Sequence, residues 1–119
     1  MSSTYFNEDN LECGCGHCVS LDMSDDLMLK LNAARHLADT PFVILSAYRC
    51  PEHNKKVGGS PTSSHMKGLA VDIRTTSSAN RHQILSGLLA AGFTRVGVYL
   101  GFIHVDVDST KTSPVMWLG

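Results

Sequence analysis

The stretch Leu69–Arg74 (LAVDIR) indicates the fold, because its side chains alternate with the period of a β-strand. Its larger apolar side chains share one face, and Asp72 lies on the other. The stretch Phe102–Val107 (FIHVDV) alternates in the same way and places His104 and Asp106 on the face opposite its aliphatic residues. Two such stretches predict neighbouring strands of one sheet.

Helical and strand-like segments surround these two stretches. Ser24 is a predicted N-cap, and the apolar residues after it recur at helical spacing until Pro41 disfavours helix. A second helix is expected from Ser77 or Ser78 to about Ala91. Further strands are expected over residues 42–48, 94–99 and 115–118, with a hairpin turn at 100–101 and a turn of helix at 52–57. Because short links join the late strands, the sequence predicts an α+β domain with a mainly antiparallel sheet and two main helices.

Length and composition exclude several classes of protein. The chain has 119 residues, of which 43% are hydrophobic and 18% charged, and its formal net charge is -1. These values predict a single domain over residues 1–119, in which residues 1–24 form an irregular, cysteine-rich arm. A charge near zero argues against nucleic acid as a partner, and no segment has the roughly 20 apolar residues of a membrane-inserted helix. The N-terminus lacks a recognisable secretory signal, so we expect synthesis in the cytoplasm.

Three residues carry the clearest indication of chemistry. Asp72 and His104 would point into one hollow if their strands pair, and His65 lies in the Gly/Ser/Pro-rich loop before the first of these strands. Two imidazoles and one carboxylate, with a fourth position open, form the ligand set of a catalytic zinc site. For each residue alone, a buried histidine or an ion-paired aspartate is the simpler interpretation. The predicted zinc site therefore depends on the three residues together.

The cysteines form a second candidate site. Three of them lie in the motif CGCGHC, and the fourth is remote in sequence: Cys13, Cys15, Cys18 and Cys50. Four thiolates could hold a structural zinc, with His17 as a spare ligand, whereas disulfides are less expected without a secretory signal. A disulfide and reduced thiols remain alternatives. We expect Cys50 to lie close to the other three cysteines and so to tie the N-terminal arm to the loop that carries Arg49.

Three segments together resemble a known family. Ser63–Asp72 (SSHMKGLAVD) matches the pattern Ser-x-His-x-x-Gly-x-Ala-x-Asp of the zinc D,D-peptidases, which comprise zinc D-Ala-D-Ala carboxypeptidases and related endopeptidases. Ser46–Asn54 (SAYRCPEHN) resembles the segment that precedes this motif, and Phe102–Asp106 (FIHVD) resembles the late strand that carries a histidine. The resemblance covers nearly the whole chain after the arm. It implies the hedgehog/DD-peptidase fold and a catalytic zinc bound by His65, Asp72 and His104.

The same resemblance implies an activity. It indicates a zinc metallopeptidase that hydrolyses stem or cross-link peptides of bacterial peptidoglycan, as an endolysin-like endopeptidase or a DD-carboxypeptidase. The short chain is similar to phage-borne and prophage members, which implies action on the cell wall after release or within a phage particle. We expect the protein to be a monomer. A cytosolic D-Ala-D-Ala dipeptidase is one alternative. A non-catalytic zinc-containing module of the same fold, which binds cell wall or a protein partner, is another.

Further residues are candidates for roles in binding and catalysis. Arg49 resembles the motif arginine, and its guanidinium suits a substrate carboxylate or an oxyanion. Ser63 and Tyr99 are further candidates for contacts with substrate. Many family members carry an acidic general base three residues before the last zinc histidine, but Gly101 occupies that position here. We therefore expect Asp106 to be the general base, and the alternative is that it only orients a zinc-bound histidine.

Overall fold

The fold is built on a five-stranded sheet with the strand order β1-β2-β4-β3-β5. The structure is a computed structural model, and it describes residues 5–6, 11–15 and 23–119. The strands are β1 (Ile44–Ser46), β2 (Ala70–Arg74), β3 (Arg95–Val98), β4 (Phe102–Asp106) and β5 (Val115–Leu118). The predicted hairpin at residues 100–101 is confirmed, because the Tyr99 backbone N–H donates to the Phe102 carbonyl oxygen at 2.9 Å.

The sheet is mixed, so the prediction of a mainly antiparallel sheet is confirmed only in part. The pairs β1–β2, β2–β4 and β3–β4 are antiparallel, but β3 and β5 are parallel. The reason lies in the connection over residues 107–114. Both sides of β4 are already occupied, by β2 and β3, so β5 joins the sheet at the free edge of β3. Because the connection is short, β5 begins at the end of the sheet where β4 ends. The strand β3 begins at this same end, so β3 and β5 run parallel.

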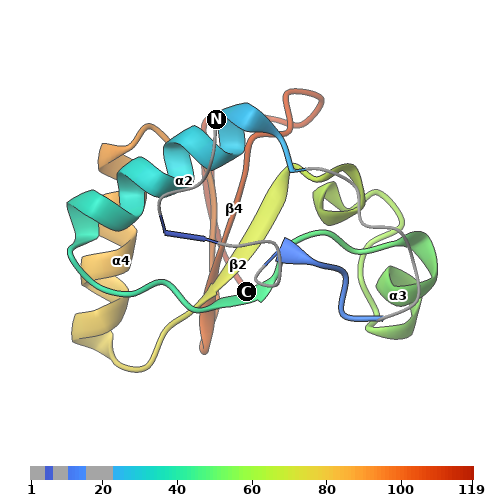
Figure 1. The fold of residues 1–119 in the computed structure, drawn as a ribbon, viewed down its shortest axis with the longest axis horizontal. Helices are drawn as coiled ribbons and strands as arrows, with labels where there is room; N and C mark the ends of the chain where they lie inside the picture. Colours follow the sequence, from blue (N-terminus) through green and yellow to red (C-terminus); the bar gives the residue numbers. More distant parts are fainter. Residues whose placement is uncertain (1–4, 7–10, 16–22) are drawn as a thin grey trace.

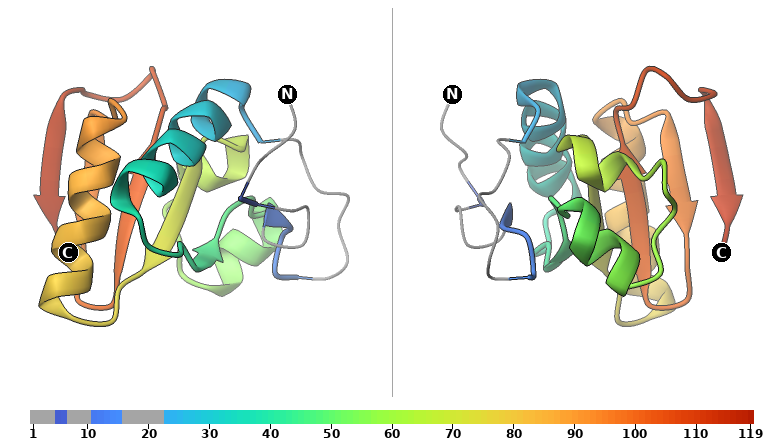
Figure 2. Two further views of the ribbon diagram at one scale, coloured as in Figure 1. Left: turned by 60° about the vertical axis from the view of Figure 1, so that its left-hand side comes forward. Right: turned by 90° about the vertical axis from the view of Figure 1, so that its right-hand side faces the viewer.

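Two long helices cover one face of the sheet. Figures 1 and 2 show α2 (Asp25–Ala38) and α4 (Ser78–Ala90) side by side on this face, whereas the short α3 (Pro51–Lys56) lies over the other face. The predicted N-caps are present, since Ser24 Oγ accepts the Leu27 backbone N–H and Ser77 Oγ accepts that of Asn80. None of the helices within the described ranges is long and apolar enough to cross a membrane.

The hydrophobic core lies between the two long helices and the sheet. The face of β2 and β4 that the sequence predicts to be apolar is fully buried there, with Val71, Ile73, Ile103 and Val105 at 0% exposure. The helices contribute buried side chains that include Leu27, Leu31, Ala34, Ile84 and Leu88. Burial of each large aliphatic side chain stabilises the fold by about 1.5–3 kcal/mol. Because this face is apolar, the polar side chains of β2 and β4 are left on the opposite face.

Gly87 lies where α4 approaches α2 most closely. A Cβ atom at this position would be 2.6 Å from the Ala34 carbonyl oxygen and 2.7 Å from Ala38 Cβ. We expect Gly87→Ala to lower the free energy of unfolding, because overpacking costs about 1–3 kcal/mol and exceeds the gain in helix propensity of up to about 1 kcal/mol. Urea unfolding measures the difference. Gly101→Ala is the control, since a Cβ there meets nothing within 4 Å, and similar losses in the two variants would contradict the packing argument.

Candidate metal centre

The polar face of the sheet brings the three predicted metal ligands together. Asp72 of β2 lies directly opposite His104 of β4 in the strand register, and His65 comes from the 3-10 helix η1 (Ser64–Lys67) just before β2. Asp72 Oδ1 is 2.9 Å from His104 Nδ1 and 3.2 Å from His65 Nε2. One ligand atom from each of the three residues lies within 4.8 Å of the other two.

His65 is oriented by the backbone around it. Ser63 caps η1 by accepting the His65 backbone N–H at 3.2 Å, and the helix ends at Gly68, whose φ of 70° favours glycine. The His65 side chain is buried, and its Nδ1 lies 2.7 Å from the Ala47 carbonyl oxygen. Because a carbonyl oxygen only accepts, Nδ1 carries the proton and Nε2 faces Asp72. The strand β1 (Ile44–Ser46) is shorter than the predicted strand over 42–48, and Ala47, whose carbonyl oxygen faces His65, lies just beyond its end.

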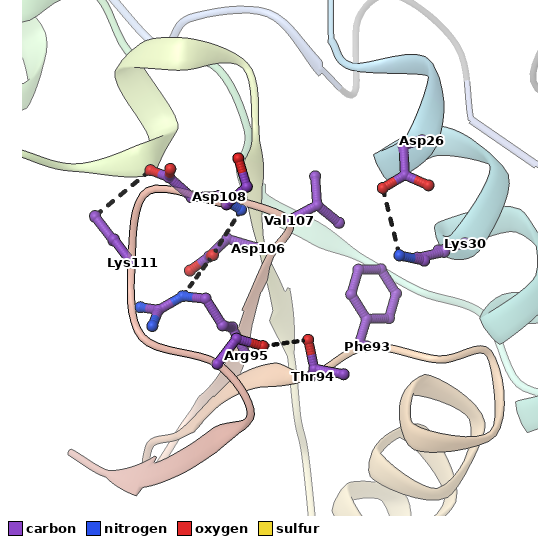
Figure 3. A pocket seen from close by; sticks show the side chains of 11 residues that line it. Asp26, Lys30, Phe93, Thr94, Arg95, Asp106, Val107, Asp108 and Lys111 are labelled. Atoms are coloured by element: carbon purple, nitrogen blue, oxygen red, sulfur yellow. Dashed lines mark hydrogen bonds and ion pairs between the residues drawn. The ribbon is translucent and has the colours of Figure 1, made fainter.

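His104 is oriented by a carboxylate on its other side. Asp106 Oδ2 lies 2.8 Å from His104 Nε2, whereas Asp106 Oδ1 accepts from Arg95 Nε at 2.8 Å and from the Asp108 backbone N–H at 3.1 Å. Figure 3 shows Arg95 reaching Asp106 beside the second buried acid, Asp108. The Asp106 side chain is 1% exposed, so its negative charge is neutralised by contacts on both sides. Asp106 therefore holds the Nε2 proton of His104 and leaves Nδ1 facing Asp72.

This arrangement favours a cation between the three side chains. With both outer ring nitrogens protonated, neutral His65 and His104 each present a lone pair to the same oxygen, Asp72 Oδ1. Two lone pairs and a carboxylate oxygen repel one another unless both rings are protonated or a metal ion binds. Two imidazoles and one carboxylate are a nitrogen and oxygen donor set that zinc accepts. The residues present thus fit a zinc ion.

Without a metal ion, protons on the inner ring nitrogens can supply the positive charge, and the charges of the centre then agree with this interpretation. Burial opposes ionisation of Asp72, but hydrogen bonds with His104 and His65 outweigh burial and lower the pKa of the carboxyl to about 2. Burial also opposes the charged form of His104, yet its hydrogen bonds to Asp106 and Asp72 raise the pKa of the imidazole. For Asp106, burial is again outweighed, first by the hydrogen bond with His104, so the pKa of this carboxyl is lowered. The centre therefore favours ionised carboxylates with positive charge between them.

The centre opens into a cavity of about 370 Å³. Arg49, Ser63 and Tyr99, which the sequence analysis expects to contact substrate, all line this cavity. Arg49 Nη2 donates to Ser63 Oγ at 3.3 Å, and Tyr99 OH accepts from Trp117 Nε1 at 2.9 Å. The structure thus gathers the expected substrate-binding side chains around the three candidate ligands.

The cysteines gather at a separate place. The sulfur atoms of Cys13, Cys15 and Cys50 lie within 4.8 Å of one another, in agreement with the expected proximity of Cys50 to the arm. Cys18 and His17 belong to residues 16–22, outside the described part of the chain.

Sequence reasoning missed two side chains of the centre. Arg95 lies opposite Asp106 in the β3–β4 register, and a register derived from the predicted hairpin could have found this pair. Trp117 packs on Gly97, where a Cβ would lie 2.5 Å from the indole, and its ring centroid is 5.6 Å from that of His104. No local signal indicates the position of Trp117, because β5 reaches the sheet only through tertiary packing.

A third missed residue, Asp108, anchors the helix that carries His65. Asp108 is 1% exposed, and its Oδ2 accepts from Ser64 Oγ at 2.8 Å and from Lys67 Nζ at 3.1 Å. Its Oδ1 accepts from Thr110 Oγ1 at 2.6 Å. Burial opposes ionisation, but these hydrogen bonds, that of Thr110 first, outweigh it and lower the pKa of the Asp108 carboxyl. Asp108 therefore joins η1 to the chain that follows β4.

Asp108→Asn tests the stabilising effect of this anchor. Because the folded state lowers the pKa of Asp108 below its unfolded value of about 3.9, the stabilisation is present above that pH and is lost as the pH falls towards the folded-state pKa. We expect the variant to be less stable than the wild type at neutral pH, with the difference shrinking below about pH 4. Urea unfolding of the metal-free proteins across this range measures it. A difference that stays constant down to the lowest pH would contradict the role given to the ionised carboxylate.

Comparison with known proteins places the chain in a family. No curated protein matches the chain. The family model of peptidase M15 matches residues 4–106, a range that includes β2, β4 and the three candidate ligands. This match agrees with the resemblance to zinc D,D-peptidases and supports a zinc-dependent peptidase. With 103 of its 119 residues covered, counted from 4 to 106 inclusive, the chain belongs to the peptidase M15 family.

Proposed function

We propose that this chain is a zinc-dependent peptidase that hydrolyses peptide bonds in the stem or cross-link peptides of bacterial peptidoglycan. The observation that carries the proposal is the convergence of His65 Nε2, Asp72 Oδ1 and His104 Nδ1 beside an open cavity. We assign these three residues as the zinc ligands. A zinc ion held by them would supply Lewis-acid chemistry for hydrolysis of a peptide bond.

The remaining cavity residues would bind and orient the peptide. Arg49 presents a guanidinium that suits a substrate carboxylate or a carbonyl oxygen that gains negative charge. Ser63 Oγ restrains this guanidinium from 3.3 Å away and offers a further polar contact. Tyr99 OH accepts a hydrogen bond from Trp117, so its own proton is available to an oxygen of the substrate.

For Asp106 we propose the orienting role. Its two carboxylate oxygens already contact His104 and Arg95, and its side chain is 1% exposed, so it is poorly placed to take a proton from the cavity. Its hydrogen bond to His104 Nε2 instead keeps Nδ1 aimed at Asp72. The general-base role is the alternative, since Asp72 and Asp106 are the carboxylates among the described residues that line the cavity.

One observation favours a second candidate function. Gly101 occupies the position at which many zinc D,D-peptidases carry an acidic residue as the general base, and glycine has no side chain that could transfer a proton. A non-catalytic zinc-containing module that binds cell-wall peptide would keep the ligands and the cavity but would not hydrolyse its ligand. One measurement distinguishes the two functions. The zinc-loaded peptidase would release new amino and carboxyl groups from purified peptidoglycan, and the binding module would not.

The ligand assignment predicts the loss of zinc and of hydrolysis together. We expect His104→Ala to lose the zinc of this centre and the release of peptides, because His65 and Asp72 alone leave the site with two ligands. Inductively coupled plasma mass spectrometry measures zinc, and mass spectrometry of the products distinguishes removal of terminal D-alanine from cleavage of cross-links. His82→Ala, a change at an exposed histidine of α4, is the control and should retain both properties. If the wild type carries one zinc ion more than His104→Ala and still gives no product, the non-catalytic module is favoured.

Asp106→Asn separates the orienting role from the general-base role. We expect zinc affinity to fall by about 10–100-fold, because the amide holds the His104 ring less firmly, with kcat at saturating zinc close to that of the wild type. Loss of a general base would lower kcat by about 10²–10⁴-fold with zinc still bound. Competition with a chelator gives the affinity, and peptide release at saturating zinc gives kcat. A large fall in kcat in the zinc-saturated variant would overturn the orienting role.

A further inference from the structure

A second cluster of soft metal ligands lies apart from the candidate metal centre. The sulfur atoms of Cys13, Cys15 and Cys50 lie within 4.8 Å of one another, and Cys50 Sγ is 3.8 Å from Cys15 Sγ. Cys13 and Cys50 are 6% and 8% exposed. The Cys50 backbone N–H donates to Cys13 Sγ at 3.3 Å. None of these contacts belongs to the proposed hydrolytic function.

The cluster is assembled from two segments that are remote in sequence. Residues 11–15 of the N-terminal arm meet residues 48–50, where the Tyr48 backbone N–H donates to the Leu11 carbonyl oxygen at 3.4 Å. Gly14 lies between two of the cysteines and packs against the His53 imidazole of α3, and a Cβ there would be 3.1 Å from His53 Nε2. The small residue therefore lets the two flanking thiols approach Cys50 closely.

We propose that Cys13, Cys15 and Cys50 supply three thiolate ligands of a structural zinc ion. Sulfur ligands brought together from short turns are typical of closed, structural zinc sites, whereas catalytic sites keep an open position. A disulfide joins two sulfur atoms at most, whereas a metal ion can contact all three of these sulfur atoms at once. The backbone N–H groups that point to Cys13 Sγ and Cys50 Sγ, at 3.3 and 3.4 Å, stabilise the negative charge that thiolates carry when they bind a metal.

The site would fix one wall of the cavity. Arg49 precedes Cys50 directly, its backbone N–H donates to the His65 carbonyl oxygen at 3.1 Å, and its guanidinium lines the cavity. A zinc ion on the three thiolates would hold the arm and α3 together next to this arginine. An effect of this zinc ion on substrate binding by Arg49 rests on the proposed function, whereas the zinc site itself does not.

Metal stoichiometry of the full chain tests the proposal without reference to activity. We expect two zinc ions per wild-type chain, one in the double variant His65→Ala/His104→Ala, and one in the double variant Cys13→Ser/Cys50→Ser. Inductively coupled plasma mass spectrometry after expression with added zinc gives these numbers. One zinc in the wild type together with none in the histidine variant would overturn the thiolate site, whether or not the protein hydrolyses peptidoglycan.

Cobalt substitution and thiol counting keep the test valid if the cysteine variant fails to fold. Thiolate ligands give Co²⁺ an intense charge-transfer band in the near ultraviolet, and imidazole and carboxylate ligands do not. We expect this band in the wild type and in His65→Ala/His104→Ala, and four reactive thiols per denatured, metal-free chain that has not met reductant. Absence of the band from the folded histidine variant, or two fewer thiols because of a disulfide, would overturn the proposal.

Discussion

The pairing of β2 with β4 in one register is the constraint on which the rest of the structure depends. In this register Asp72 lies opposite His104, and on the other face Ile73 lies opposite Ile103. Because side chains alternate along a strand, a shift of one residue would move the polar pair into the core and the apolar pair into the cavity. Burial of the aliphatic face against α2 and α4 therefore maintains the geometry of the candidate metal centre. Core packing and site geometry are consequences of the same alternation.

The register of β2 and β4 does not by itself determine the orientation of the two imidazole rings. His65 depends on the Ala47 carbonyl, which is available because β1 leaves the sheet after Ser46, and His104 depends on Asp106. Asp106 in turn is neutralised by Arg95 of the neighbouring strand. Each ring thus has one nitrogen bound to a fixed acceptor and the other directed at Asp72. Such pre-organisation reduces the cost of binding a metal, because the ligands need little rearrangement.

The two clusters of metal-type ligands have different chemistry in one small domain. The candidate metal centre uses nitrogen and oxygen donors next to an open cavity, which suits a metal that must contact a substrate. The proposed thiolate site uses sulfur donors, two of them buried, and one of these, Cys50, directly follows Arg49 in the chain. A domain of this size buries a limited apolar surface, so a structural metal that ties the N-terminal arm to α3 would add stability to the fold. Membership of the peptidase M15 family supports zinc as a cofactor, and the candidate metal centre is the cluster that suits a catalytic zinc ion.

Local patterns in the sequence were sufficient for the strands, the two long helices with their caps, and the motif that contains His65 and Asp72. Alternation also predicted that His104 and Asp106 share a face, since side-chain direction in a strand follows from position alone. Local patterns could not predict the parallel placement of β5, the packing of Trp117 on Gly97, the pairing of Arg95 with Asp106, or the anchoring of η1 by Asp108. Nor could spacing decide the role of Asp106, which depends on whether its oxygens face the cavity or its neighbours. These features depend on which strand edges remain free and on where loops cross the sheet, and such contacts join residues far apart in the chain, so no short stretch of sequence encodes them.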